Sequence, residues 1–173
     1  LVNADRFRTG ANDLHQAAVP AVLRELTDIE FDLRGYPASA KEKLLLIVMS
    51  RYIEATALGA GAGELRVGFG RLSRLDDEHG TREVYTQLGE SDVETHVYGV
   101  GSDATGYPDG ITVHEGDTPE YRRSWFLTYE PPAGETDAVS LVAWETGENV
   151  WRGAWTFDAA FTERVASYVR ADL

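Results

Sequence analysis

Cysteine is absent from the 173-residue sequence. This absence excludes disulfides and thiolate metal sites. The sequence also lacks an apolar run long enough to span a membrane, and it lacks a basic-then-apolar signal pattern at its start. We therefore expect a soluble, cytoplasmic protein that does not cross a membrane. The chain begins with Leu1 in place of methionine, so it is expected to be a stand-alone protein that was trimmed or one module of a longer chain.

Lysine is almost absent, with Lys41 and Lys43 as its two occurrences. Acidic residues number 29 against 16 basic ones, which gives a net charge of −13. The excess is either an ordinary acidic surface or an adaptation to high salt, and the second interpretation is favoured because salt screens repulsion between carboxylates. Direct binding to nucleic acid is disfavoured, because such a surface would not neutralise a line of phosphates.

Adaptation to high salt makes a direct prediction about stability. Removing salt should lower the melting temperature, because repulsion among the 29 acidic groups is then no longer screened. Thermal melts followed by circular dichroism over a series of falling KCl concentrations measure this effect. A melting temperature that does not change with salt would contradict the interpretation.

The length fits one domain with a real core. We predict an α/β fold, with α+β as the alternative, built on a central mixed sheet of about five strands. Two N-terminal helices and a C-terminal helix are expected to pack on this sheet. Residues 1–38 would hold the first helix, over 13–27, and a segment at 28–37 that is either a short strand or, as favoured, a linker. Residues 39–173 would form the main globular unit.

The stretch from Ser39 to Leu75 is expected to organise the fold. A helix over 39–58 carries six consecutive apolar residues from Leu44 to Met49, which indicates burial on more than one side. Glycines 59, 61 and 63 follow it and are typical of a helix stop. A phosphate-binding loop is disfavoured, because that motif follows a strand and precedes a helix.

The remaining pattern predicts a strand–helix–strand unit with parallel strands, then a meander and a closing helix. The short helix is expected at 81–88 with Thr81 as its cap, and Asp158 is expected to cap the closing helix, which runs to about Arg170. The inner face of that last helix is predicted to consist of Phe161, Val165, Tyr168 and Val169. The expected strands are 65–72, 94–100, 123–129, 138–145 and 150–157, with a further small strand at 111–113.

No catalytic residue and no metal site are predicted. The four histidines, His15, His79, His96 and His114, form no HExxH or HxH pattern. The run from Asp76 to His79 is the densest potential metal cluster, and it is interpreted as a solvated turn. The GxSxG and SxxK motifs of serine nucleophiles are absent as well.

Arg51 and Glu54 are the most informative charges, because they follow the apolar run of the central helix by one turn. They form either an i,i+3 salt bridge or a site in which the arginine points into a pocket, helped by Arg71 or Arg74. Late in the chain, Trp151 and Trp155 are expected to share one strand face. The gap between them at Gly153 either admits a ligand or is closed by core packing, which is favoured.

Several short segments occur in a recognisable order: SRYIEATAL, RVGFGRLSRL, TREVYTQL, VYGV and WRGAWTFDAAFTERVASYV. Together they resemble the DICT sensory domain, a family associated with diguanylate cyclases and two-component systems. The similarity spans residues 39–173, and the acidic, lysine-poor composition is similar to that of its haloarchaeal members. The resemblance implies a non-enzymatic signalling input domain with a link to light responses. It supplies no catalytic residues, and the sequence leaves any cofactor unknown.

Three functional hypotheses follow. The first is a sensory domain that binds a small ligand or a signalling partner protein without chemistry, in a pocket between the central helix and the aromatic face of the sheet. The second is an enzyme acting on a small acidic organic substrate, and the third is a structural module that forms a homodimer through its N-terminal helix. The residues expected to contact the ligand are Arg51, Glu54, Arg71, Arg74, Tyr85, Trp125 and Trp155.

Overall fold

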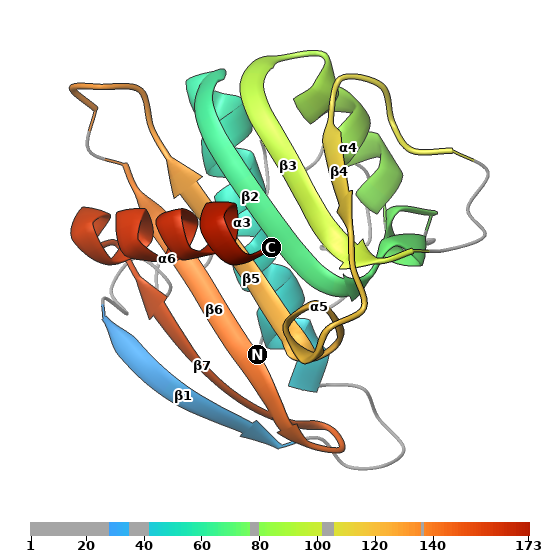
Figure 1. Ribbon diagram of the computed structural model, residues 1–173. Coiled ribbons are helices and arrows are strands. Elements are labelled where there is room, and N and C mark those ends of the chain that lie inside the picture. Colours follow the sequence, from blue (N-terminus) through green and yellow to red (C-terminus); the bar gives the residue numbers. More distant parts are fainter. Residues whose placement is uncertain (1–27, 35–41, 77–79, 102–105, 136) are drawn as a thin grey trace.

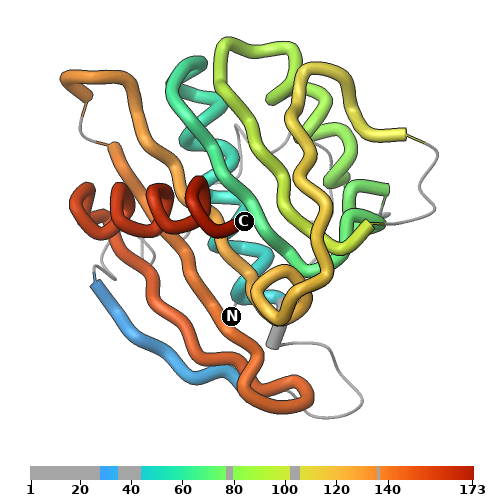
Figure 2. The backbone as a smooth tube through the Cα atoms, viewed as in Figure 1, coloured from blue at the N-terminus to red at the C-terminus, as the bar shows by residue number. Residues whose placement is uncertain are grey.

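The computed structural model describes residues 28–34, 42–76, 80–101, 106–135 and 137–173. These residues build a single sheet with helices on both of its faces, and Figure 2 traces the same path as a tube. The first predicted helix, at 13–27, lies outside the described residues. None of the helices within the described ranges is long and apolar enough to cross a membrane.

The sheet has seven strands in the order β1-β7-β6-β5-β2-β3-β4. Strands β2, β3 and β4 run parallel to one another, and every other neighbouring pair is antiparallel. This confirms the mixed α/β fold and the parallel strand–helix–strand unit, with a larger sheet than the predicted one of about five strands. The strands are β1 (Ile29–Arg34), β2 (Ala62–Arg71), β3 (Asp92–Val100), β4 (Thr112–Glu115), β5 (Ser124–Glu130), β6 (Val139–Gly147) and β7 (Val150–Thr156).

The favoured assignment of a linker before the central helix is wrong, because Ile29–Arg34 forms the edge strand β1. This strand pairs antiparallel with β7, and its side chains alternate between half-buried and exposed. Ile29, Phe31 and Leu33 point toward the core. The alternation was visible in the sequence, but three apolar residues do not specify a strand until a partner supplies the backbone hydrogen bonds.

The helices cover the two faces of the sheet unequally. Helix α3 (Glu42–Ala60), the 3-10 helix η2 (Leu72–Asp76) and helix α4 (Thr81–Gly89) pack on one face and enclose most of the core. Helix α6 (Ala159–Asp172) crosses the opposite face in front of β5 and β6, and the short helix α5 (Pro119–Arg123) lies near β2 and β3 (Figure 1). A smaller cluster on that face consists of Tyr98, Tyr121, Phe126 and Val169.

Helix α3 is the spine of the core, as predicted. Leu46, Val48 and Met49 from its apolar run are fully or almost fully buried. The helix ends at Ala60, where Gly61 takes a left-handed φ of 69° and donates its N–H to the Ala57 carbonyl at 2.9 Å. This geometry confirms the glycine stop, because a left-handed residue after a helix is favourable for glycine.

The two predicted helix caps differ in outcome. The Asp158 side chain accepts hydrogen bonds from the backbone N–H groups of Ala160 and Phe161, at 2.8 and 3.2 Å, which confirms it as the cap of α6. The prediction that Thr81 caps α4 is wrong, because the cap position is Gly80, which makes no side-chain bond. Thr81 is instead buried in the helix, where its hydroxyl joins a polar cluster described below.

The predicted inner face of α6 is partly wrong, because Tyr168 is 52% exposed. The residues of α6 that become buried are Thr162, Ala166 and Val169. The Ser140 hydroxyl of β6 donates a hydrogen bond to the Thr162 hydroxyl at 2.9 Å, inside this contact. The buried face of α6 includes small and hydroxyl-bearing side chains. A sequence pattern of large apolar residues does not identify such a face.

The gap at Gly153 is closed by core packing, which confirms the favoured interpretation. A Cβ at this glycine would lie 2.6 Å from the Val142 carbonyl oxygen and 2.7 Å from the Phe31 ring. Trp151 and Trp155 on either side are 5% and 0% exposed. The edge strand β1 therefore fills the space that the sequence left open for a ligand.

Candidate functional site

Three of the predicted site residues meet in a buried cluster between α3 and α4. Arg51 Nη1 lies 2.7 Å from Glu54 Oε2, and Arg51 Nη2 donates to the Thr81 hydroxyl at 2.8 Å. The Tyr85 hydroxyl donates to Glu54 Oε1 at 3.0 Å. The side chains of Arg51 and Glu54 are 7% and 3% exposed. The predicted i,i+3 salt bridge between Arg51 and Glu54 is therefore present, and helix α4 contributes Thr81 and Tyr85 to it.

Burial raises the pKa of Tyr85 well above its usual range, and the neighbouring Glu54 carboxylate raises it further. The phenol therefore stays protonated and donates to Glu54 across the accessible pH range. A carboxylate that accepts bonds from both Arg51 and Tyr85 ties the two helices together. This cluster is chemically suited to holding α3 and α4 in place.

The other four residues predicted to contact a ligand are Arg71, Arg74, Trp125 and Trp155. The Arg74 guanidinium lies 4.8 Å from the centre of the Trp125 ring, a cation–π distance, and Trp125 Nε1 donates to the Ser50 hydroxyl at 2.9 Å. Arg71 is exposed at the end of β2. Trp155 is fully buried, and its ring packs edge-on against Tyr52 and Phe157. Arg74 therefore pairs with Trp125, Trp155 belongs to the core, and Arg71 lies at the surface.

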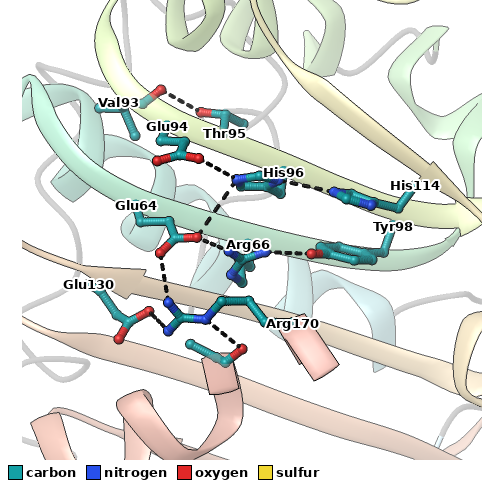
Figure 3. A network of polar contacts seen from close by, with 11 residues as sticks. Glu64, Arg66, Val93, Glu94, Thr95, His96, Tyr98, His114, Glu130 and Arg170 are labelled. Atoms are coloured by element: carbon teal, nitrogen blue, oxygen red, sulfur yellow. Dashed lines mark hydrogen bonds and ion pairs between the residues drawn. The ribbon is translucent and has the colours of Figure 1, made fainter. Parts of the chain in front are cut away.

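A second polar network lies on the opposite face of the sheet (Figure 3). It arises because alternate residues of neighbouring strands point to the same face. The register places Glu64 of β2 beside Glu94 of β3, and Tyr98 of β3 beside His114 of β4. The members of this network, which we call the sheet-face network, are Glu64, Arg66, Glu94, His96, Tyr98, His114, Glu130 and Arg170.

Glu64 is the centre of the sheet-face network. Its Oε1 accepts a hydrogen bond from Arg66 Nη2, and its Oε2 lies 3.3 Å from Arg170 Nη1. Arg170 also contacts Glu130 Oε2 at 2.8 Å through its Nη2. Because Arg170 belongs to α6, the carboxylate of Glu64 connects the parallel strands of the sheet to the C-terminal helix.

His96 stands between an acidic group and a second imidazole. Its Nδ1 lies 3.0 Å from His114 Nε2, while its Nε2 lies 3.1 Å from Glu94 Oε1 and 3.7 Å from Glu64 Oε1. The Tyr98 ring stacks on His114 at 4.3 Å between ring centres. These contacts hold the His96 ring with its Nε2 facing the two carboxylates.

Arg66 and its neighbours create an unusual electrostatic environment. Arg66 Nη1 donates to the Tyr98 hydroxyl at 2.5 Å, whereas its Nε is buried without a hydrogen-bond partner. Burial lowers the pKa of His114, and the nearby His96 and Arg66 lower it further. Burial raises the pKa of Glu130, although Arg170 opposes this effect. The face thus favours a neutral His114 near pH 7.

Glu64, Glu94 and His96 together form a possible metal-binding group. One ligand atom from each lies within 4.8 Å of the others. The sequence analysis missed this group, because it searched for histidine pairs and for neighbours along the chain. The readable signal was the Glu94-x-His96 spacing, which places both side chains on one face of a strand. Glu64 could not be added to it without knowing the register of β2 against β3.

An open groove of about 660 Å³ borders the sheet-face network. It lies between the segment that follows β5 and the outer side of α6. Glu130 and Arg170 belong both to the groove and to the network. The Arg170 end of the network therefore faces this open groove.

Comparison with known proteins supports the fold alone. No family model and no curated protein matches the chain, so the resemblance to the DICT family stays a prediction. A solved polyphosphate kinase from Porphyromonas gingivalis is similar in structure, with a TM-score of 0.50 and 14% sequence identity. The similarity covers 94% of this chain and 28% of that kinase, so the chain spans less than a third of its length. At this identity the kinase's activity is not transferable.

Proposed function

We propose that this chain is a non-enzymatic sensory input domain of a cytoplasmic signalling pathway, which binds a small ligand and passes the binding event to a partner protein. The resemblance to the DICT family motivates the class of function. The sheet-face network is the observation that supports it best. Ionisable side chains gather there on adjacent strands and on helix α6, where a charged or metal ligand would find several partners.

In this proposal, the sheet-face network transmits ligand binding on the sheet to helix α6. Glu64 is shared between Arg66 on the sheet and Arg170 on α6. A ligand that binds the Glu64 carboxylate weakens the attraction between Glu64 and Arg170. The Arg170 side chain, which is 40% exposed, can then pair with another group. The buried side chains of α6 are Thr162, Ala166 and Val169, and half-buried Val165 packs beside them. In this proposal, the loss of the Arg170 ion pair shifts α6 against the sheet.

A thermal-shift screen of the full chain against nucleotides, flavins, retinoids and divalent metal ions tests the proposal. A specific ligand should raise the melting temperature, because binding to the folded state stabilises it by mass action. The ligand should be recovered unchanged after incubation. A screen without any stabilising compound, or chemical conversion of the compound that binds, would overturn the proposal of a non-enzymatic sensor.

The coupling to α6 is tested separately by hydrogen–deuterium exchange. Glu64→Gln should increase amide exchange in α6, because a neutral amide holds Arg170 less strongly than a carboxylate does. Glu83→Gln is the matched control, since Glu83 is an exposed acid in the first turn of α4, on the other face of the sheet. Equal exchange of α6 in both variants and the parent protein would show that the network does not control this helix.

A further inference from the structure

We propose that Glu64, Glu94 and His96 bind a divalent transition-metal ion, with Zn²⁺ as the probe that tests it. This inference deepens the proposed function, on which it rests, by naming the ligand class of the sheet-face network. The three residues come from two adjacent parallel strands, and their ligand atoms lie within 4.8 Å of one another. In a tetrahedral site with bonds of about 2.0–2.2 Å, ligand atoms lie about 3.3–3.6 Å apart, so the most widely spaced pair must move closer to hold an ion.

The individual distances show how little rearrangement is needed. His96 Nε2 already lies 3.1 Å from Glu94 Oε1 and 3.7 Å from Glu64 Oε1. Glu94 is 71% exposed, so its side chain is free to adjust around an ion, and it leaves a path from solvent. His96 and Glu64, at 12% and 18% exposure, form the fixed part of the site.

Neighbouring side chains form hydrogen bonds to the proposed ligands and orient them, as the groups that surround metal ligands commonly do. His114 Nε2 lies 3.0 Å from His96 Nδ1, and in the tautomer in which His96 Nδ1–H donates to His114 Nε2, the lone pair of His96 Nε2 is free for a metal. Arg66 and Arg170 each bond one oxygen of Glu64. Because each carboxylate oxygen has two lone pairs, Glu64 can keep these bonds while it ligates a metal.

Arg66 gives an independent indication that a ligand belongs here. Its side chain is only 7% exposed, and its Nε atom is buried without a hydrogen-bond partner. A buried donor of a charged group is costly to leave unpaired, so it points to an acceptor that the protein does not supply. A water molecule or an anion that arrives with a metal ion would be such an acceptor.

The charges favour a cation. The network holds the carboxylates of Glu64, Glu94 and Glu130 against the guanidinium groups of Arg66 and Arg170. Among the described residues, Glu94 has an ion pair with His96 alone, and that pair exists only when His96 is protonated. A divalent ion at this position would therefore meet a carboxylate that no arginine of the network pairs with, beside the imidazole of His96.

The donor set selects the class of metal. One imidazole nitrogen with two carboxylates suits Zn²⁺ and its first-row neighbours such as Co²⁺ and Mn²⁺. Ca²⁺ and Mg²⁺ prefer sites built from oxygen ligands alone. We therefore expect Zn²⁺ to bind and Mg²⁺ to leave the chain unaffected at equal concentration.

Isothermal titration of the chelator-stripped full chain with Zn²⁺ is the test. The parent protein should bind one ion, and Co²⁺ in its place should give the visible absorption of a protein-bound ion. Glu94→Gln should weaken binding by at least about 10-fold, and His96→Ala should weaken it further, since loss of an outer partner alone costs roughly 10- to 100-fold. Glu94 is exposed, so its variant is expected to fold normally, which a thermal melt in chelator verifies.

Two controls make the outcome decisive. Glu83→Gln removes the same charge from the opposite face and should leave Zn²⁺ affinity unchanged. His79→Ala examines the run from Asp76 to His79, the cluster that the sequence analysis considered. Binding that is lost in His79→Ala and retained in His96→Ala, or no Zn²⁺ binding by the parent protein, would overturn this site. Binding at His96 without any change in α6 exchange would instead refute the proposed sensing and leave the metal site standing.

Discussion

Replacing Arg51 with alanine is expected to lower the free energy of unfolding by about 3–5 kcal/mol, the usual cost of breaking a buried ion pair. The reason is that Glu54, 3% exposed, would be left buried without the guanidinium that lies 2.7 Å away. The Tyr85 hydroxyl would remain as a donor to Glu54, but a neutral phenol does not replace a guanidinium. Denaturation by guanidinium chloride, followed by circular dichroism, measures the loss.

Two matched variants separate this effect from a general sensitivity to arginine removal. Arg71→Ala removes an exposed arginine near the end of β2 and should change stability by no more than about 0.5 kcal/mol. The double variant Arg51→Met with Glu54→Leu removes both charges and should be more stable than Arg51→Ala alone. If Arg51→Ala keeps the stability of the parent protein and only weakens a ligand-induced rise in melting temperature, Arg51 is a ligand contact.

Replacing Trp155 with alanine is expected to destabilise the fold by about 3–5 kcal/mol, as for other large aromatic residues removed from a core. The Trp155 side chain is fully buried, and its ring lies 5.5 Å from Tyr52 and 5.3 Å from Phe157 in edge-on geometry. The cavity would open between α3 and the strands β7 and β1. Chemical denaturation of the variant measures this cost.

The conservative change Trp155→Phe is the informative control. Trp155 Nε1 is buried without a hydrogen-bond partner, so phenylalanine removes an unsatisfied donor while it keeps much of the ring. An unsatisfied buried donor costs about 1–3 kcal/mol, and its removal should offset part of the lost packing. Trp155→Phe should therefore be clearly more stable than Trp155→Ala. Equal losses would indicate that the indole nitrogen has a partner in solution, as expected of a residue that contacts a ligand.

The sequence was most informative where a segment carries its own signal. The apolar run of α3, the glycines after it and the Asp158 cap each act over a few neighbouring residues, and the structure confirms all three. The parallel pairing of β2 with β3 followed from a strand, a short helix and a strand in sequence. Local chemistry was enough in these cases because the decisive hydrogen bonds and contacts are local.

Other features depended on partners that are distant in the chain. The segment 29–34 becomes a strand because β7, about 120 residues later, pairs with it. The packing of α6 on β5 and β6 determines which side of the helix is buried. As a result, Tyr168 is exposed and Thr162 is buried. A pattern of apolar residues describes what a segment is able to bury, whereas the sheet decides which part of it is buried.

The candidate sites show the same division. By itself the sequence offered the pairing of Arg51 with Glu54 as one of two alternatives, since a spacing of three residues on a helix brings two side chains together, and the structure shows this pair. It also contained the Glu94-x-His96 spacing. The tertiary structure alone decided that Glu64 completes this group and that Arg170 connects it to α6, because strand register and helix docking are long-range choices.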